Sequence, residues 1–364
     1  MAVVQPFRAL RYEVAKAGPL ESLVAPPYDV IAPEERQDYL ARSPYNVVHL
    51  TLPDEERDAA RSWAEWRRDG VLVADEEPCF WSLSQTYVGP DGVERTRTGL
   101  VTSLQVEPYE RGVVLPHERT HRGPKEGRLR LLRAVRAQLE PILLLYDSAT
   151  PVEPPEGGAD VEADGARLWR VGDAAGIGEF FADKRLLIAD GHHRYETALA
   201  FHEEEGTAAS SFMMVVLVST RDLGLTIFPT HRIAGRAPEL DGGLQVTPIS
   251  GGPAEAVRML EGLTRAHPAF VVYRKRGTAL VEAVDADELD TAAVARLGLE
   301  DVSYTPRMEE AVAAVDAGRA EAAFLVRPPT VEQVAAVAER GQTLPQKTTY
   351  FYPKLLSGLL FHPV

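Results

Sequence analysis

Apolar residues recur along this chain in two kinds of pattern. Unbroken runs such as Arg185–Ala189 and Phe212–Ser219 predict buried strands. Apolar residues three and four positions apart predict helices with one buried face, as at Tyr195, Ala198 and Leu199. The expected helices are Pro33–Ala41, Asp54–Asp69, Arg128–Gln138, the segment after Gly191, Ala254–Ala266, Arg307–Ala317 and Val331–Arg340. The expected strands are Met1–Arg11, Glu77–Val88, Thr96–Gln105, Pro141–Tyr146, Arg185–Ala189, Phe212–Ser219, Leu225–Phe228, Ala269–Lys275 and Ala322–Val326.

This order of elements predicts an α/β (α+β) protein with mixed sheets. Trp63 and Trp66, three residues apart, are expected to anchor a core. The stretches 148–167 and 233–252 are rich in Pro and Gly, and we expect a solvated insertion or short hairpin and a linker there. Three segments are expected: 1–110 as an N-terminal α/β segment, 111–245 as a core and 246–364 as a C-terminal α/β segment.

Composition argues against nucleic-acid-binding, disulfide-stabilised and membrane-spanning proteins. The formal charge of −15 and the pI near 5.1 oppose a nucleic-acid-binding surface. A single cysteine, Cys79, excludes an internal disulfide framework. No run of apolar residues is long enough to span a membrane, and the N-terminus lacks a signal-peptide pattern. We therefore expect a cytoplasmic protein with no membrane partner, and the sequence does not indicate its oligomeric state.

The chemistry-bearing stretch follows the strand at Arg185. Gly191 allows a tight turn, and a helix then begins with His192, His193 and Arg194. Free N–H groups and the positive end of a helix favour an anion, so this turn is a candidate phosphate site, although a solvated first turn is an equal alternative. Asp190 could orient a histidine or bind a metal ion. Zinc is less favoured, because adjacent histidines on a helix point about 100° apart.

A second motif, His117-Glu118-Arg119-Thr120-His121, matches the H-E-x-x-H pattern of zinc proteases. That motif requires a helix, but Pro116 precedes it and Gly123-Pro124 follow it. A polar loop leading into the helix Arg128–Gln138 is the better interpretation. This loop is expected to carry the following residues: His117, Glu118, Thr120, Lys125 and Arg128.

Several motifs together resemble a known family. The stretch ADGHHRYETAL at Ala189–Leu199 is similar to the signature of the SerK-like free-serine kinases, a family long described as a domain of unknown function with a ParB/sulfiredoxin-like core. Further matching stretches are APPYDVI (Ala25–Ile31), YNVVHL (Tyr45–Leu50), HERTHRGPKEGRLRLL (His117–Leu132), PTHR (Pro229–Arg232) and PQKTTYFYPK (Pro345–Lys354). One departure is Gly127, where the family usually has an acid.

The resemblance implies a kinase that transfers a phosphoryl group from ATP or ADP to free L-serine, with Mg²⁺. It implies that Glu118 is the base, with Asp190 and His193 also catalytic and Asp190 a metal ligand. Nucleotide binding is expected of the following residues: Gly191, His192, Arg194, Lys125, Arg128 and Lys347. Substrate binding is expected of the following residues: Tyr28, Asp29, His117, Thr120, His231 and Arg232.

Other functions stay open from the sequence. A nucleotide- or metabolite-sensing module would keep the phosphate site without turnover, as ParB-like folds allow. A phosphatase could use the same anion site, since the sequence does not show the direction of transfer. The loop acid Glu118 favours an enzyme, because a sensor needs no base. Lys347 and Lys354 flank an aromatic, hydroxyl-rich stretch that could bind nucleotide phosphates and stack on a base.

Overall fold

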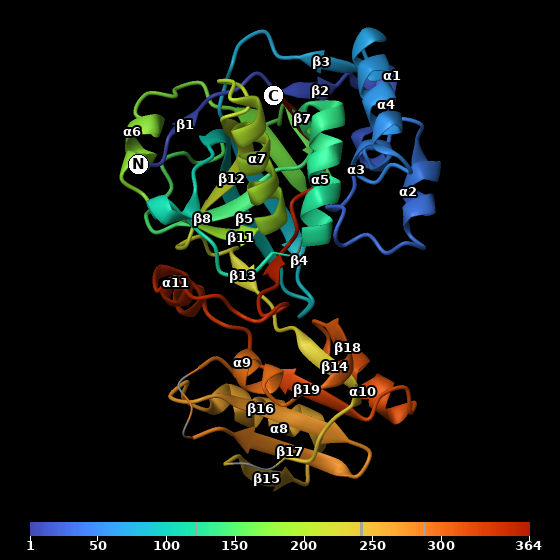
Figure 1. Cartoon of the computed structure of the whole chain (residues 1–364), viewed down its shortest axis with the longest axis vertical. Helices are drawn as coiled ribbons and strands as arrows, with labels where there is room; N and C mark the ends of the chain where they lie inside the picture. The colour runs from blue at the N-terminus through green and yellow to red at the C-terminus, as the bar shows by residue number, and fades with distance from the viewer. Residues whose placement is uncertain (121, 241–242, 285, 287) are drawn as a thin grey trace. The chain divides into compact units, whose positions relative to one another are not determined.

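The computed structural model describes residues 1–120, 122–240, 243–284, 286 and 288–364. These residues form two compact units. Unit 1 contains Met1–Gly89, Val93–Leu225 and Pro353–Val364, and unit 2 contains Pro90–Gly92 and Thr226–Tyr352. Both units combine helices and strands, so the predicted α/β (α+β) class is confirmed (Figure 1). The three consecutive segments expected from the sequence remain a prediction.

Within the described residues, unit 1 is built on a nine-stranded mixed sheet. Its strand order is β6-β11-β8-β12-β5-β4-β10-β9, and β1 pairs with β5. The pairs β6–β11 and β8–β12 are parallel, whereas β8–β11 and β5–β12 are antiparallel. Its strands are β1 Val4–Gln5, β4 Trp81–Val88, β5 Glu94–Gln105, β6 Val114–Leu115, β8 Ile142–Tyr146, β9 Val161–Ala163, β10 Ala166–Arg170, β11 Leu186–Asp190 and β12 Phe212–Ser219.

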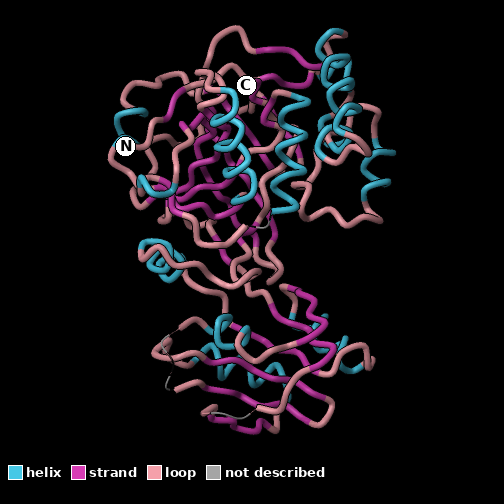
Figure 2. Tube along the Cα trace, in the orientation of Figure 1, coloured by secondary structure: helices cyan, strands magenta, loops and turns pink. Residues whose placement is uncertain are grey.

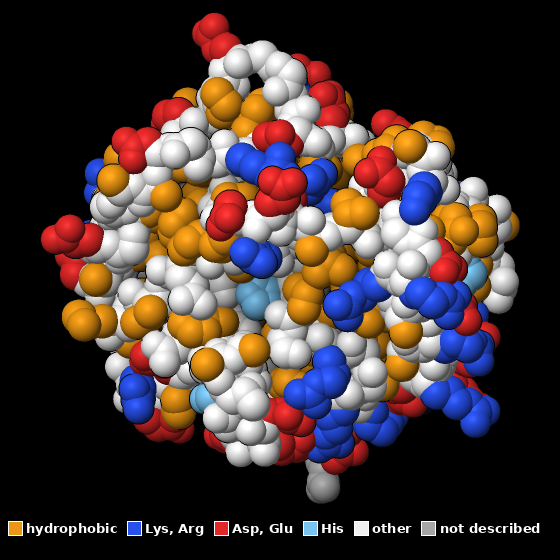
Figure 3. Space-filling model, turned by 90° about the horizontal axis from the view of Figure 1, so that it is seen from above, with side chains coloured by type: hydrophobic (Ala, Val, Ile, Leu, Met, Phe, Trp, Pro, Cys, Tyr) orange, Lys and Arg blue, Asp and Glu red, His pale blue; other side chains and the backbone are white. Residues whose placement is uncertain are grey.

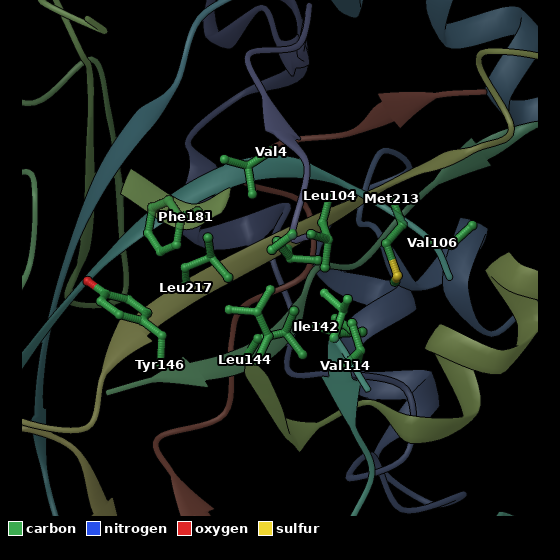
Figure 4. Packing of buried hydrophobic residues seen from close by; sticks show 14 of the residues in the cluster. Val4, Leu104, Val106, Val114, Ile142, Leu144, Tyr146, Phe181, Met213 and Leu217 are labelled. Carbon is green, nitrogen blue, oxygen red and sulfur yellow. The ribbon is translucent and has the colours of Figure 1, made fainter. Parts of the chain in front are cut away.

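One face of this sheet carries a large hydrophobic core. Alternate residues of each strand point to the same face, so Ile142 and Leu144 of β8 meet Met213 and Leu217 of β12 (Figure 4). Helix α7 (His192–Glu205) covers this face with its buried residue Tyr195. Helices α5 (Arg122–Val135) and α7 pack side by side in unit 1. The strand and helix expected from the Arg185–Gly206 pattern are therefore both present.

The N-terminal helices form a second core in unit 1. Trp63 and Trp66 lie on α4 (Glu56–Arg68) and are 4% and 5% exposed, which confirms the core role expected of them. Phe361, near the C-terminus, packs edge-on against Trp63. The remaining elements of this part are α1 Val14–Ala17, η1 Leu20–Ser22, α2 Arg36–Arg42, α3 Val48–Thr51, β2 Leu10–Tyr12, β3 Leu72–Ala74, β7 Ala137–Gln138 and β21 His362–Pro363, with η2 Tyr109–Arg111 and α6 Ile177–Ala182 elsewhere in unit 1.

Unit 2 has an antiparallel sheet of its own, with the order β15-β17-β16-β19-β14-β18 in the described residues (Figure 2). Helices α8 and α10 pack on one face through Ala256, Leu260 and Val315, and α9 packs on the other through Val294. The elements are β13 Thr226–Ile227, β14 His231–Arg236, β15 Gln245–Ile249, α8 Gly252–Gly262, β16 Ala269–Arg274, β17 Gly277–Glu282, α9 Asp290–Ala295, β18 Glu300–Thr305, α10 Met308–Asp316, β19 Ala322–Val326, α11 Val331–Glu339 and β20 Phe351–Tyr352.

The two stretches rich in Pro and Gly both contain strands. The expected linker 233–252 instead contains most of β14 and all of β15, because its residues pair with distant strands of unit 2. The expected insertion 148–167 contributes β9 and the start of β10, whose residues Val161 and Ala163 are buried. β9 and β10 pair with each other in antiparallel fashion, so the hairpin alternative for this stretch is confirmed. The linker prediction was wrong, because Pro and Gly do not exclude a strand when distant strands supply its partners.

The surface mixes charges of both signs. Figure 3 shows acidic and basic side chains interspersed on one face. Between α5 and α7, Arg133 pairs with Glu204 and Arg136 pairs with Glu205, each pair with a contact below 3 Å. Among the described residues, none of the helices combines the length and apolar character that crossing a membrane requires.

Candidate functional site

The junction between β11 and α7 is the centre of the candidate site. Gly191 has a φ of 104°, in the left-handed region that glycine tolerates. A Cβ atom there would lie 2.4 Å from Cγ2 of Ile142, so a side chain has no room. The chain therefore passes from the strand into the helix within one residue, and Asp190 and Arg194 come to lie on either side of the turn.

Asp190 is the centre of an ionic network. Its side chain is 12% exposed, and Oδ2 accepts a hydrogen bond from Nη2 of Arg194 at 2.7 Å. Nζ of Lys354 pairs with Oδ1 of Asp190. Although burial opposes ionisation, the charges of Lys354 and Arg194 hold the pKa of Asp190 at about 2. Arg194 also donates from Nη1 to the carbonyl oxygen of Pro141 at 2.6 Å, so this guanidinium is fixed on two sides.

Two histidines pack beside this network. The backbone N–H of His117 donates to Nε2 of His192 at 3.2 Å, and the two rings meet edge to face at 4.6 Å. Burial lowers the pKa of His117 to about 4 and holds that of His192 well below its ordinary value. His192 is thus neutral at pH 7, rather than one of three cations at the helix start. The hydrogen bond to Nε2 places its proton on Nδ1.

The loop before α5 runs alongside α7. Oγ1 of Thr120 donates to Oε2 of Glu196 at 2.8 Å, and Nζ of Lys125 pairs with the same oxygen at 3.2 Å. Glu118 is half-buried in this loop, between His117 and Thr120, and both of these neighbours contact α7. The structure therefore brings the loop that carries Glu118 to the first turns of α7.

The start of α5 corrects one expectation. This helix begins at Arg122, so Lys125 and Arg128 lie on a helix rather than on a loop. His117 lies before the helix, in a non-helical segment. His121, the second histidine of the H-E-x-x-H pattern, lies outside the described residues.

A hollow opens between α5, α7 and the segment that leads into β8. About 410 Å³ of empty space lies within it, and part of this space is open solvent. Arg128 of α5 and Arg194 of α7 line this hollow, together with Glu140, which precedes β8 in the sequence. Cζ of Arg128 lies 4.0 Å from the ring centroid of Tyr28, whose backbone N–H donates to Oε1 of Glu140. Two guanidinium groups and an aromatic ring thus meet at one place. Asp29, beside Tyr28, is exposed.

Three of the predicted site residues belong to unit 2. His231 is buried in β14 and accepts a hydrogen bond at Nδ1 from the N–H of Val326, and burial lowers its pKa to about 4. Arg232 donates to the carbonyl oxygens of Thr230 and Lys347, and burial lowers its pKa to about 10. Lys347 has an exposed side chain. Their predicted roles in binding remain predictions.

Sequence reasoning missed several residues of the network. Glu140, which lies between the expected helix and the expected strand Pro141–Tyr146, accepts hydrogen bonds from Tyr28 and Ser357. Its signal is a lone acid directly before the strand-forming PILLLY. Glu196 accepts a hydrogen bond from Thr120 and pairs with Lys125. Its position on the helix, directly after the motif, is the one sequence feature that could have indicated a role in the site.

The described residues bear on the expected metal site at Asp190. They contain no group of three or more His, Cys, Asp and Glu side chains that could coordinate an ion. Both carboxylate oxygens of Asp190 already accept from cations. The described side chains therefore do not form a preformed Mg²⁺ site, and Asp190 can become a metal ligand only after Lys354 or Arg194 releases an oxygen.

Comparisons with solved structures found distant likenesses. A free serine kinase in complex with AMP is 18% identical over 66% of this chain and 83% of the other, with a TM-score of 0.40. A conserved hypothetical protein from Pyrococcus furiosus is 17% identical over 67% and 89%, with a TM-score of 0.36. C-terminally truncated SbnI from Staphylococcus aureus is 12% identical over 70% and 85%, with a TM-score of 0.39. Likenesses this loose assign neither fold nor activity.

The chain was also compared with curated proteins and with models of protein families. None of the curated proteins compared with the chain matches it. A family model described as a protein of unknown function, DUF1015, matches residues 4–296, which include the loop of Glu118, the whole β11–α7 junction and most of unit 1. The chain belongs to the DUF1015 family.

Proposed function

We propose that the chain is a small-molecule kinase, which transfers a phosphoryl group from ATP or ADP to free L-serine and forms O-phosphoserine. The observation that carries the proposal is the hollow between α5 and α7, where Arg128 and Arg194 line one space beside Tyr28. Guanidinium groups bind phosphate oxygens through paired N–H donors, and an aromatic ring offers a face for stacking. Serine as the acceptor rests on the resemblance carried by ADGHHRYETAL.

Phosphoryl transfer depends mainly on positioning and charge neutralisation. In the proposed reaction the serine hydroxyl oxygen attacks the terminal phosphorus of the nucleotide, and the bond from this phosphorus to its bridging oxygen breaks. The products are O-phosphoserine and ADP from ATP, or AMP from ADP. Glu118 takes the proton of the hydroxyl. Arg194, held by Asp190 and Pro141, faces the phosphates without having to reorganise.

The neutral histidines support the same assignment of roles. His117 and His192 are uncharged at pH 7, so they act as hydrogen-bonding groups and not as countercharges. His193, in the first turn of α7, is proposed to contact the transferred group. A Mg²⁺ ion would arrive with the nucleotide, because Mg²⁺ is usually bound by substrate phosphates together with one or two carboxylates. No step of the mechanism above depends on it.

Product analysis tests the proposal directly. The full chain is incubated with ATP or ADP and each amino acid in turn, with and without Mg²⁺, and ³¹P NMR follows the products. We expect serine to be the one amino acid that is phosphorylated, with O-phosphoserine as the product. Glu118→Gln should lower the rate about 10²–10⁴-fold while nucleotide affinity stays nearly unchanged, because a base acts only in the chemical step.

Glu204→Gln is the matched control. Glu204 is an exposed acid at the far end of α7, paired with Arg133, so its loss should leave the rate unchanged. Full activity of Glu118→Gln would mean that the base is another residue. Nucleotide binding without transfer to any amino acid would instead favour a sensing module.

A further inference from the structure

Arg97 is a buried cation that the proposed mechanism does not use. It lies on β5, on the same face of the sheet as Gly99 and Val101, and is 0% exposed. Nη2 donates to Oε1 of Gln85 at 2.6 Å. Nε and Nη1 are buried and, among the described residues, have no hydrogen-bond partner and form no ion pair.

This arrangement is unfavourable for the chain without a ligand. Burial lowers the pKa of Arg97 only to about 10, so the guanidinium is charged at neutral pH. A buried charge that has lost its water without gaining an opposite charge destabilises a fold, and buried polar groups normally find partners. Among the described residues, the hydrogen-bond acceptor of the Arg97 side chain is the neutral amide of Gln85. A buried guanidinium with two donors that have no acceptor in the described part of the chain is therefore a candidate for binding a ligand.

The two acids whose charges act on Arg97, Asp222 and Asp190, already interact with other groups. Asp190 binds Arg194 and Lys354. Asp222 accepts hydrogen bonds from the N–H and Oγ1 of Thr98, at 3.0 and 2.6 Å, and from the N–H of Gly224 at 2.9 Å. Neither acid lies within ion-pair distance of Arg97 in the described structure, so neither neutralises it.

Polar contacts join Arg97 to the candidate site. Nε2 of Gln85 donates to the carbonyl oxygen of Lys354 at 3.0 Å. Nζ of Lys354 pairs with Asp190, which pairs in turn with Arg194. Arg97 therefore begins a chain of contacts that crosses from β5 through β4 and the C-terminal segment to the start of α7.

We propose that Arg97 binds an oxyanion of the ligand, a carboxylate or a phosphoryl group, beside the Asp190 network. This inference deepens the proposed function and rests on it. The rigid guanidinium fork matches both oxyanions and, when buried, attracts them strongly. In the proposed reaction the oxyanion is either the carboxylate of the amino acid or a phosphate of the nucleotide.

The substitution Arg97→Met tests the role through two readouts of opposite sign. Without ligand, removal of an uncompensated buried charge should raise the Tm by a few degrees. With ligand, affinity should fall by at least about tenfold, as expected for loss of a charged hydrogen-bonding partner. A purely structural arginine would lower the Tm and leave affinity unchanged.

Arg327→Met supplies the matched control. Arg327 is another buried arginine, but Asp290 binds it through both carboxylate oxygens at 2.7 and 2.9 Å. Because this charge is compensated, its removal should lower the Tm. If Arg97→Met does not fold, Arg97→Lys takes its place in every titration. This variant keeps the positive charge but lacks the guanidinium fork.

Separate titrations identify the source of the oxyanion. Calorimetry with ADP reports on a phosphate, and calorimetry with L-serine and O-phosphoserine reports on the carboxylate. Inorganic phosphate is the third probe. It should raise the Tm of the wild-type chain but not the Tm of Arg97→Met. Selective loss of either affinity supports the inference and names the group.

The outcome that overturns the inference is equal behaviour of wild type and Arg97→Met with all three probes. Failure of the proposed function is a different result. In that case neither ADP nor serine binds the wild-type chain, yet inorganic phosphate still raises the Tm of the wild type and not of Arg97→Met. Absence of that difference as well overturns the role of Arg97.

Discussion

At the scale of single residues, burial decides which groups beside α7 carry charge. His117 and His192 would be partly protonated near pH 6.5 in water, but both are buried and neutral in the folded chain. Asp190 and Arg194 remain charged because each compensates the other. The site therefore combines the fixed charges of an ion pair with two uncharged imidazoles at pH 7.

The buried histidines predict a loss of stability in mild acid. For His117 the pKa falls to about 4, mainly through burial, with partial offsets from the Ile188 backbone and Asp190. Between about pH 6.5 and pH 4 the unfolded chain therefore binds a proton that the folded chain does not. The free energy of unfolding should fall across this window, by on the order of 3 kcal/mol for this group at pH 4.

Urea unfolding at pH 7 and pH 5 measures this effect, with His117→Gln as the test variant. Part of the pH dependence should disappear in the variant, and a remainder should persist, because His231 in unit 2 also has a pKa lowered to about 4. An identical pH dependence in wild type and variant would show that His117 is not buried as a neutral group.

At the scale of elements, the β11–α7 junction depends on one glycine. The positive φ of Gly191 and the position of Ile142 leave no space for a side chain, so the direction in which α7 leaves the sheet is fixed there. This direction sets Arg194 against Pro141 and Asp190. The geometry of the site is thus a consequence of a backbone conformation.

The substitution Gly191→Ala should lower the free energy of unfolding by about 2–4 kcal/mol, from left-handed strain and from overpacking against Ile142. Gly206→Ala, at the other end of α7, is the control. Gly206 has a φ of 64° but no atom within 4 Å of a Cβ, so only the strain of about 1–2 kcal/mol applies. Chemical denaturation compares the two variants, and equal losses would contradict the role of the Ile142 contact.

Elements were predictable where their own residues specify them. Phe212–Ser219 is apolar and β-prone over nearly its whole length, and it forms β12 with the expected bounds. The strand β14 gave no such signal, since HRIAGR becomes a strand only through pairing with β18 and β19, which follow more than sixty residues later.

The candidate site shows the same limit. The motif at Gly191 identified the helix start, and the loop of Glu118 was placed beside it only through a family resemblance. Glu140 and Glu196 could not be recognised, because an acid in a hydrophobic run or on a helix gains its meaning from contacts across the fold. Sequence thus predicted residue types at the site better than their partners.

At the scale of the whole molecule, unit 2 interrupts unit 1 in the sequence. Residues 226–352 lie between two parts of unit 1, and Pro353–Val364 completes unit 1. Within this last segment, Phe361 exchanges two backbone hydrogen bonds with Leu10, each at 2.9 Å. The second core of unit 1 therefore includes a residue that follows unit 2 in the sequence.

The ends of the inserted segment pair with each other. β13 and β20 form an antiparallel pair in which Thr226 faces Tyr352 and Ile227 faces Phe351. Adjacent ends are the condition under which an inserted domain folds independently of its host. The buried residues Phe270 and Phe324 give unit 2 a core of its own. We therefore predict that residues 226–352 fold when produced alone.

NMR and thermal unfolding of the isolated segment 226–352 check this prediction. The expected results are dispersed amide resonances and a cooperative transition, which Phe270→Ala should weaken by about 3–5 kcal/mol because its ring is fully buried. The surface substitution Arg276→Gln is the control, since this exposed side chain pairs only with exposed Glu239 and should change stability by less than about 1 kcal/mol. A disordered spectrum for the unmodified segment would mean that unit 2 depends on unit 1 for its fold, despite the pairing of its ends.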